Sequence, residues 1–123
     1  MVEFTINKAT PSLNTWQRMH FRTRHKAKKW WLEQVWAAKQ EHSITDAKCK
    51  RKVIVTRYGK MMDADNLAAG CKPLLDAMVK CELLVDDSPE WLILETQQVE
   101  ENRPKQAKTV VKVEQIGIQQ EEA

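Results

Sequence analysis

The sequence lacks most features that mark membrane, secreted or disulfide-bonded proteins. It has 123 residues and no apolar run longer than a few residues, so it predicts no membrane-spanning helix. The first ten residues carry an acid at Glu3 and no long apolar stretch, and we therefore expect no signal peptide. The three cysteines have no CxxC spacing, which favours reduced thiols in the cytoplasm over disulfides or a zinc site: Cys49, Cys71 and Cys81.

Acidic residues are missing from a long stretch near the N-terminus. No Asp or Glu lies between Glu3 and Glu33, and residues 1–62 hold 14 Lys and Arg against 4 Asp and Glu, whereas residues 63–123 hold 6 against 13. A basic half of this kind predicts a polyanionic partner, because Lys and Arg release the counterions condensed on phosphates. The alternative is an ordinary solvated surface. The candidate phosphate-binding residues are Arg18, Arg22, Arg24, Lys26, Lys28, Lys29, Arg51 and Lys60.

The sequence does contain enough apolar residues for one globular core. Hydrophobic residues make up 42% of the chain and charged residues 30%, which is typical of a folded domain rather than a disordered one. We expect one domain over residues 1–116 and a flexible tail over 117–123. The expected strands are 2–7, 50–58, 91–99 and 108–116, the expected helices are 23–41 and 65–81, and residues 10–15 are expected to form a loop.

The order of these elements predicts an α+β fold. The two helices alternate with strands, and Asn102 and Pro104 between the last two strands predict a hairpin connection. We therefore expect a single small domain in which a mixed β-sheet carries two main helices packed on it.

Three tryptophans fall on the first expected helix, beside its basic start: Trp30, Trp31 and Trp36. Such residues usually belong to a core or a subunit interface, and the alternative is stacking on bases. Because neighbours on a helix lie about 100° apart, we expect one of Trp30 and Trp31 to point away from the core, where it would suit a dimer contact. Basic residues at a helix start oppose the helix dipole, which favours a role in binding phosphate.

Two aspartates form a DxD motif just after the strand expected over 50–58. Residues two apart in an extended chain face the same side, so Asp63 and Asp65 would present two carboxylates to one small volume. A divalent cation is the simplest way to make that arrangement favourable, because the two anions repel each other. The alternative is a helix cap, in which Asp65 or Asn66 starts the next helix. The three histidines are scattered without ligand spacing and are assigned no role.

Further charged residues follow along the helix expected after the DxD motif. Asp65, Lys72 and Asp76 are spaced by seven and four, which places them along one edge of an unbroken helix. Gly70 and Pro73 weaken that register, because proline kinks a helix interior. Lys72 and Asp76 would then form only an i,i+4 ion pair.

A second acidic pair, Asp86-Asp87, follows an apolar run and precedes Ser88-Pro89. Adjacent acids at such a place either form a turn or supply one more carboxylate to a cation. Taken together, DADNL from Asp63, KPLLDAM from Lys72 and LLVDDSP from Leu83 resemble the RusA family of Holliday junction resolvases, small endonucleases of phages and prophages. The likeness extends over most of the chain, and its specific part spans residues 63–89.

The resemblance implies a cytoplasmic, bacterial or phage-encoded homodimer that nicks four-way DNA junctions symmetrically. The reaction would need Mg²⁺, with Mn²⁺ able to substitute. The implied metal-binding and catalytic carboxylates are Asp63, Asp65 and Asp87, and the implied essential lysine is Lys72. Asn66, Asp76 and Asp86 match motif positions expected to support these residues. Independently of the family, magnesium held by carboxylates is able to activate water and to offset charge on a leaving oxygen.

The chain departs from the family pattern at three places. It has three more residues between DxDN and the lysine than the shorter bacterial members, Met61-Met62 in place of a more basic lead-in, and Glu82 where glycine is frequent. Two other functions remain open on the residues alone. The first is a non-catalytic protein that binds branched DNA, and the second is a metal-dependent phosphohydrolase of free nucleotides.

Overall fold

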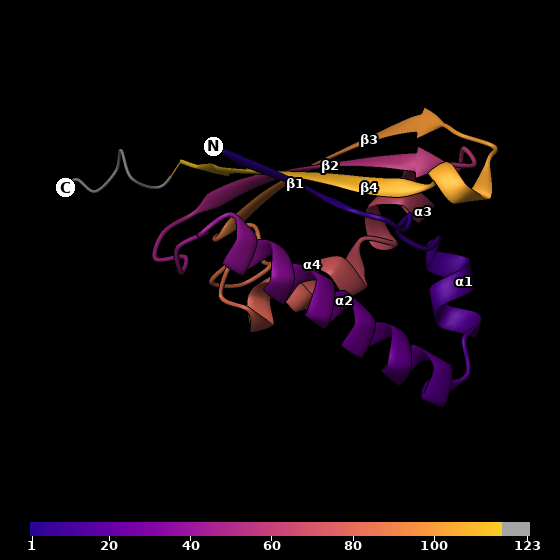
Figure 1. Ribbon diagram of the computed structural model, residues 1–123, viewed down its shortest axis with the longest axis horizontal. Helices are drawn as coiled ribbons and strands as arrows, with labels where there is room; N and C mark the ends of the chain where they lie inside the picture. The colour runs from indigo at the N-terminus through magenta and orange to yellow at the C-terminus, as the bar shows by residue number, and fades with distance from the viewer. Residues whose placement is uncertain (117–123) are drawn as a thin grey trace.

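A computed structural model describes residues 1–116, and the tail expected over 117–123 lies outside these residues. The described chain is a small α+β domain with a four-stranded mixed sheet and two main helices packed against it, which confirms the predicted fold class (Figure 1). The helices lie on one face of the sheet (Figure 1). Within residues 1–116, no helix is long and apolar enough to cross a membrane.

The four strands form close to the predicted segments. Their bounds are Val2–Ile6 for β1, Arg51–Gly59 for β2, Leu92–Glu100 for β3 and Lys108–Gln115 for β4. The order in the sheet is β1-β4-β2-β3, in which β4 is antiparallel to both β1 and β2 whereas β3 is parallel to β2. Val53 and Val55 of the central strand β2 are fully buried, as β-branched residues on the covered face of a sheet should be.

The predicted hairpin between the last two strands is wrong. In the described chain β3 pairs with β2 alone, and β4 lies on the other side of β2. The connection contains a short 3₁₀-helix, Pro104–Gln106, and leads the chain from one side of β2 to the other. Asn102 and Pro104 mark this turn correctly, but turn residues do not decide which strand becomes the neighbour.

Four α-helices form, and two of them are short. Their bounds are Leu13–Arg18 for α1, Phe21–Glu41 for α2, Ala64–Ala69 for α3 and Lys72–Lys80 for α4. The loop expected over 10–15 is only partly correct, because Ser12 accepts a hydrogen bond from the Thr15 amide and caps α1.

The single helix expected over 65–81 is in fact two helices. α3 ends at Ala69, and α4 begins at Lys72 with Pro73 in its first turn, where a missing N–H costs nothing. Gly70 lies between them and is packed tightly: a Cβ there would stand 1.9 Å from the main-chain oxygen of Pro11. Asp65 and Lys72 therefore do not share one helix edge.

The core lies between the sheet and the helices α2 and α4. Trp31, Val35 and Ala38 of α2 are buried, and their spacing of four and three residues places them along one side of the helix. Trp30 is partly buried too, with its ring edge-on to Trp31 at 5.2 Å between centroids, so the expectation that one of this pair points away is wrong. Trp36 is the exposed tryptophan of α2, with 52% of its surface open to solvent.

Candidate functional site

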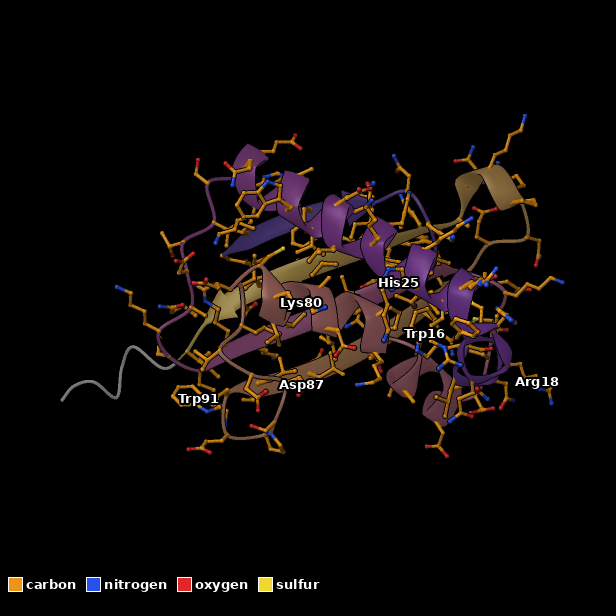
Figure 2. The ribbon with its side chains drawn as sticks, turned by 90° about the horizontal axis from the view of Figure 1, so that it is seen from below. Trp16, Arg18, His25, Lys80, Asp87 and Trp91 are labelled. Carbon is orange, nitrogen blue, oxygen red and sulfur yellow. The ribbon has the colours of Figure 1, made fainter. Side chains whose placement is uncertain are left out.

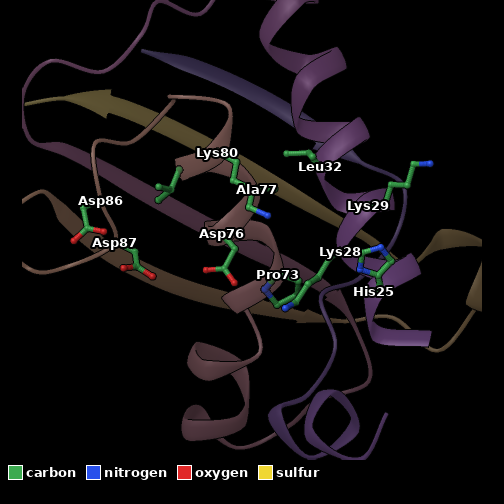
Figure 3. Close-up of a pocket in the computed structure, with 11 residues that line it drawn as sticks. His25, Lys28, Lys29, Leu32, Pro73, Asp76, Ala77, Lys80, Asp86 and Asp87 are labelled. Atoms are coloured by element: carbon green, nitrogen blue, oxygen red, sulfur yellow. The ribbon is translucent and has the colours of Figure 1, made fainter. Parts of the chain in front are cut away.

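A cavity of about 590 Å³ lies between α2, α4 and the segment that follows α4 (Figure 3). Asp76, Asp86 and Asp87 line it on one side, and His25, Lys28 and Lys29 of α2 line it on the other. The remaining lining residues are Leu32, Pro73, Ala77, Val79 and Lys80. Seen from the side of the helices, His25, Lys80 and Asp87 lie on the same face of the molecule (Figure 2). Acidic and basic side chains from distant parts of the sequence therefore share one cavity.

Asp76 lies at the cavity because the other face of α4 is buried. Leu74 and Met78 are fully enclosed in the core, and burial of each such side chain contributes about 1.5–3 kcal/mol. Asp76 is left half-exposed, with its Oδ1 3.5 Å from Lys72 Nζ. This is the i,i+4 pair that the spacing allowed, and between such exposed groups it contributes only a few tenths of a kcal/mol. Lys72 itself does not line the cavity.

α4 ends in a left-handed turn that directs the chain toward the aspartates. Glu82 has a φ of 65°, a conformation that glycine adopts more readily than any other residue. The Glu82 amide donates to the Val79 carbonyl, and the Leu83 amide donates to the Met78 carbonyl at 2.8 Å. Leu83 and Met78 are both buried, so the turn is held by hydrogen bonds and by the core.

The segment 81–91, which carries Asp86 and Asp87, is fastened to the fold at both ends. Its carbonyl groups accept four hydrogen bonds from other elements, which are Lys39 Nζ to Cys81 at 2.8 Å, the Ala47 amide to Glu82 at 2.7 Å, Arg51 Nη1 to Leu83 at 2.9 Å and the Arg51 amide to Trp91 at 3.2 Å. Arg51 therefore holds the segment on both sides of the two aspartates.

Arg51 is an internal residue, and the prediction that it binds phosphate is wrong. Only 4% of its surface is exposed. Besides the Leu83 carbonyl, its guanidinium donates to Gln115 Oε1 at 2.7 Å and to Thr45 Oγ1 at 3.2 Å. Burial lowers the pKa of Arg51 below its ordinary value. The physical reason lies in the strand, since Arg51 shares the covered face of β2 with Val53.

The DxD motif starts α3, and Asp63 is its N-cap. Asp63 Oδ1 accepts from the Asn66 amide and Oδ2 accepts from Asn66 Nδ2, both at 2.9 Å. These two hydrogen bonds lower the pKa of Asp63 below its ordinary value. Asn66 Oδ1 also accepts from the Asn14 amide at 3.2 Å, which ties α3 to α1. The capping residue is thus Asp63 rather than Asp65 or Asn66, and Asp65 lies exposed in the first turn.

The cavity gathers some of the predicted metal-binding carboxylates and not others. Asp87 lines it together with Asp86 and Asp76, whereas Asp63 and Asp65 belong to α3 and are not among its lining residues. Over residues 1–116, no three His, Cys, Asp or Glu side chains form a group that could hold a metal ion. The donor chemistry nevertheless fits Mg²⁺, which binds through one or two carboxylates and keeps water and phosphate in its remaining positions.

The basic residues of α1 and α2 form an exposed surface beside this cavity, which we call the basic face: Arg18, Arg22, Lys26, Lys28 and Lys29. Lys60 is also exposed, on the connection from β2 to α3. Arg24 differs from these residues, because its Nη2 donates to the carbonyls of Gln17 at 3.0 Å and Met19 at 3.2 Å. Arg24 therefore holds the connection between α1 and α2.

Two residues of this region were not singled out from the sequence. His25 lines the cavity opposite the aspartates. Phe21 is 69% exposed at the start of α2, with its ring stacked on His20 at 4.6 Å and the Arg22 guanidinium 5.8 Å from its centroid. The signal for Phe21 was a lone aromatic residue among cations, a pattern common on surfaces that bind nucleic acid.

A scan of protein-family models finds no match to the chain, and no curated protein matches its sequence.

Proposed function

We propose that the protein is a magnesium-dependent, structure-specific DNA endonuclease that resolves four-way junctions as a homodimer, as its resemblance to the RusA family implies. One observation carries the proposal: Asp76, Asp86 and Asp87 share a cavity with Lys28 and Lys29 of the basic face. A nuclease needs both kinds of group, because carboxylates hold the metal ion and cations hold the phosphates. Carboxylates beside a phosphate-binding surface repel phosphate unless a cation neutralises them, which favours a metal-dependent nuclease over a protein that only binds DNA.

Asp87, with Asp86 beside it, is the group that would hold Mg²⁺ at the cavity. Asp63 and Asp65 are further ligands that the resemblance implies, but they do not line this cavity. When bound, the ion would supply a water of lowered pKa and neutralise charge on the leaving oxygen. Mg²⁺ prefers hard oxygen ligands such as carboxylates, and a site built from few of them leaves room for phosphate oxygens.

The cations of the chain would bind and orient the strand to be cut. Lys28 and Lys29 reach the cavity from α2 and would hold phosphate oxygens there, while the rest of the basic face would hold the neighbouring DNA arm. His25 lies beside them and is able to donate a hydrogen bond to the same strand. Lys72 would offset charge on the phosphate, although its position next to Asp76 makes it a smaller contributor here.

The test uses a labelled four-way junction and a linear duplex of matching sequence, each with Mg²⁺, with Mn²⁺ and with chelator. We expect paired nicks in the junction only, and only with metal. Asp87→Asn should lower the cleavage rate by about 100-fold or more, because it removes a charged metal ligand, while junction binding is retained. Glu90→Gln is the matched control, since Glu90 is an exposed acid three residues further on that does not line the cavity.

Two other outcomes would each contradict the proposal in a different way. Tight junction binding without cleavage under either metal would leave a protein that binds branched DNA. Hydrolysis of free nucleotides that competitor DNA does not inhibit would indicate a nucleotide phosphohydrolase.

A further inference from the structure

The strand β3 forms an open edge of the sheet. Over the described residues its strand neighbour is β2 alone, and β2, β4 and β1 all lie to one side of it (Figure 1). Exposed edges are usually blunted by proline, by lysine or by a bulge. The nine residues of β3, LILETQQVE, contain no proline and no lysine, and they stay in register with β2 from end to end. This edge is therefore a template on which another strand is able to pair.

The hydrogen bonds to β2 show which groups of β3 face outward. The Arg51 amide donates to the Trp91 carbonyl, and the Glu101 amide donates to the Gly59 carbonyl, so the odd-numbered residues turn their main-chain groups toward β2. Because this direction alternates along a strand, the even-numbered residues turn theirs toward the open edge. These residues are Leu92, Leu94, Thr96, Gln98 and Glu100. The Leu92 amide already donates to the Ser88 carbonyl at 2.9 Å, so Leu92 offers only its carbonyl to the edge.

Two exposed apolar side chains are placed symmetrically on the same strand. Ile93 is 41% exposed and Val99 is 43% exposed, and both belong to the face of β3 opposite that of the buried Leu92. Each lies three residues from Thr96, which is the middle of the strand. On this face of β3 the apolar pattern is thus unchanged when the strand is reversed about Thr96.

We propose that β3 pairs with β3 of a second copy of this chain, antiparallel about a two-fold axis at Thr96, so that the two sheets become one. In this register each Ile93 lies opposite the Val99 of the other copy. That pair falls at a position without main-chain hydrogen bonds, where facing side chains come closest. The free outward groups of the even-numbered residues meet one another and supply about eight main-chain hydrogen bonds, because the Leu92 amide of each copy is already bonded to Ser88.

The two neighbouring registers of the paired strands are less favourable. Moving the axis to Glu95 places that carboxylate opposite its own copy, which brings two like charges together. Moving it to Gln97 places Val99 opposite Glu95 and Ile93 opposite Glu101, so both apolar side chains lose their partners. The register centred on Thr96 avoids both defects, which makes the dimer specific rather than a general tendency to aggregate.

The symmetry of this dimer suits the proposed function, on whose homodimer the inference rests. A two-fold axis between paired antiparallel strands stands perpendicular to the sheet, so the helices of both copies lie on the same side. The two basic faces and the two cavities then point toward one surface of the dimer. A four-way junction is itself roughly two-fold and would meet two equivalent sites there.

The main test is the mass of the full chain in solution, measured by sedimentation equilibrium without DNA. We expect a dimer for the wild type and a monomer for Thr96→Pro. The Thr96 N–H faces the open edge, so proline there removes no bond to β2 and is tolerated in the monomer. Thr96→Val is the matched control and should remain a dimer, and so should Trp36→Gln, which removes the exposed tryptophan of α2.

A charge exchange tests the register itself. Ile93→Lys or Val99→Glu alone should raise the dimer Kd by about tenfold, because each breaks two apolar pairs per dimer. The two changes in one chain place the introduced lysine opposite the introduced glutamate of the other copy, and should recover most of the loss.

The inference is overturned if the wild type is a monomer at about 100 times the protein concentration used for cleavage, or if neither Thr96→Pro nor Ile93→Lys changes the dimer Kd. Because no DNA is present, these results are separable from those for cleavage. A β3 dimer that cuts no junction rejects the proposed function alone, and a junction-cutting dimer built on another surface rejects this inference alone.

Discussion

Glu82 has a left-handed backbone conformation that is unfavourable for a residue with a side chain. Its φ of 65° costs an ordinary residue about 1 kcal/mol or more, and glycine much less. The strain is maintained because the turn is fastened by buried Leu83 and by the hydrogen bonds that end α4. This turn sets the direction of the chain from the end of α4 to Asp86.

We predict that Glu82→Gly raises the free energy of unfolding by about 1 kcal/mol, because it relieves this strain. Urea denaturation followed by circular dichroism measures the change. Lys80→Gly is the matched control: Lys80 is exposed and helical, so glycine there should lower stability by about 1 kcal/mol. A loss of stability in both variants would contradict the role given to Glu82.

Asn66 stabilises the ionised form of Asp63, and this makes the stability of the fold depend on pH. Its two hydrogen bonds hold the pKa of Asp63 below the ordinary value. A carboxyl with a depressed folded-state pKa stabilises the fold above its unfolded pKa of about 4, and this contribution is lost as the pH falls through the folded pKa.

We therefore predict that Asn66→Ala returns the pKa of Asp63 toward the ordinary value, as measured by NMR titration of the side-chain carboxyl. The stability difference between wild type and variant should be larger at neutral pH than in acid below the folded-state pKa, where Asp63 is protonated in both states. If the stability difference did not depend on pH, Asn66 would stabilise the fold only through its hydrogen bond with the Asn14 amide.

The segment 81–91 after α4 is held on both sides of its two aspartates by one buried residue, Arg51. Its guanidinium donates to the Leu83 carbonyl and its amide to the Trp91 carbonyl, and two further guanidinium bonds anchor Arg51 to Gln115 and Thr45. Removing the guanidinium leaves the buried Leu83 carbonyl without its donor, and each such loss costs about 1–3 kcal/mol.

We predict that Arg51→Met lowers the free energy of unfolding by about 2–3 kcal/mol and raises the Mg²⁺ concentration needed for cleavage. Both follow from loosening the segment that carries Asp86 and Asp87. Lys52→Met is the matched control on the same strand, since Lys52 faces outward and its ion pair with Glu95 is largely exposed. Equal effects of the two changes would contradict the role of Arg51 in holding the segment 81–91.

At the scale of the whole molecule, the positive charges are concentrated on one part of the surface. The net charge of the chain is only +3, yet the exposed cations of α1 and α2 form one basic face without an acid on that stretch of sequence. Affinity for DNA follows this local density and not the net charge, because each contacted phosphate releases counterions.

We predict that junction binding without metal weakens steeply with salt, with a slope of log K against log salt of about −4 to −5. The double variant Lys28→Gln, Lys29→Gln should reduce the magnitude of this slope by about 2. Lys105→Gln, on the 3₁₀-helix near the end of β3, should leave it unchanged. Fluorescence anisotropy of a labelled junction measures all three, and a slope near zero would contradict binding by the basic face.

Local patterns predicted much of the fold and part of the candidate site. The alternation in β2 placed that strand to within a residue, and it also contained the answer for Arg51, which shares a face with Val53 and Val55. The charge pattern alone suggested an exposed arginine. At this position the strand period decides, because every second side chain of a half-covered strand must be buried.

The order of apolar and polar residues by itself determined that this chain forms strands and helices at these places, that α2 presents Trp31 and Val35 to a core, and that its start is basic. These are properties of neighbouring residues, set by periods of 2 and 3.6. Only the tertiary structure decided that β4 inserts between β1 and β2, that β3 is left with an open edge, and that Asp87 meets Lys28 across a cavity. Those depend on which distant segments bury one another's apolar surface, a global competition that no short stretch of sequence encodes.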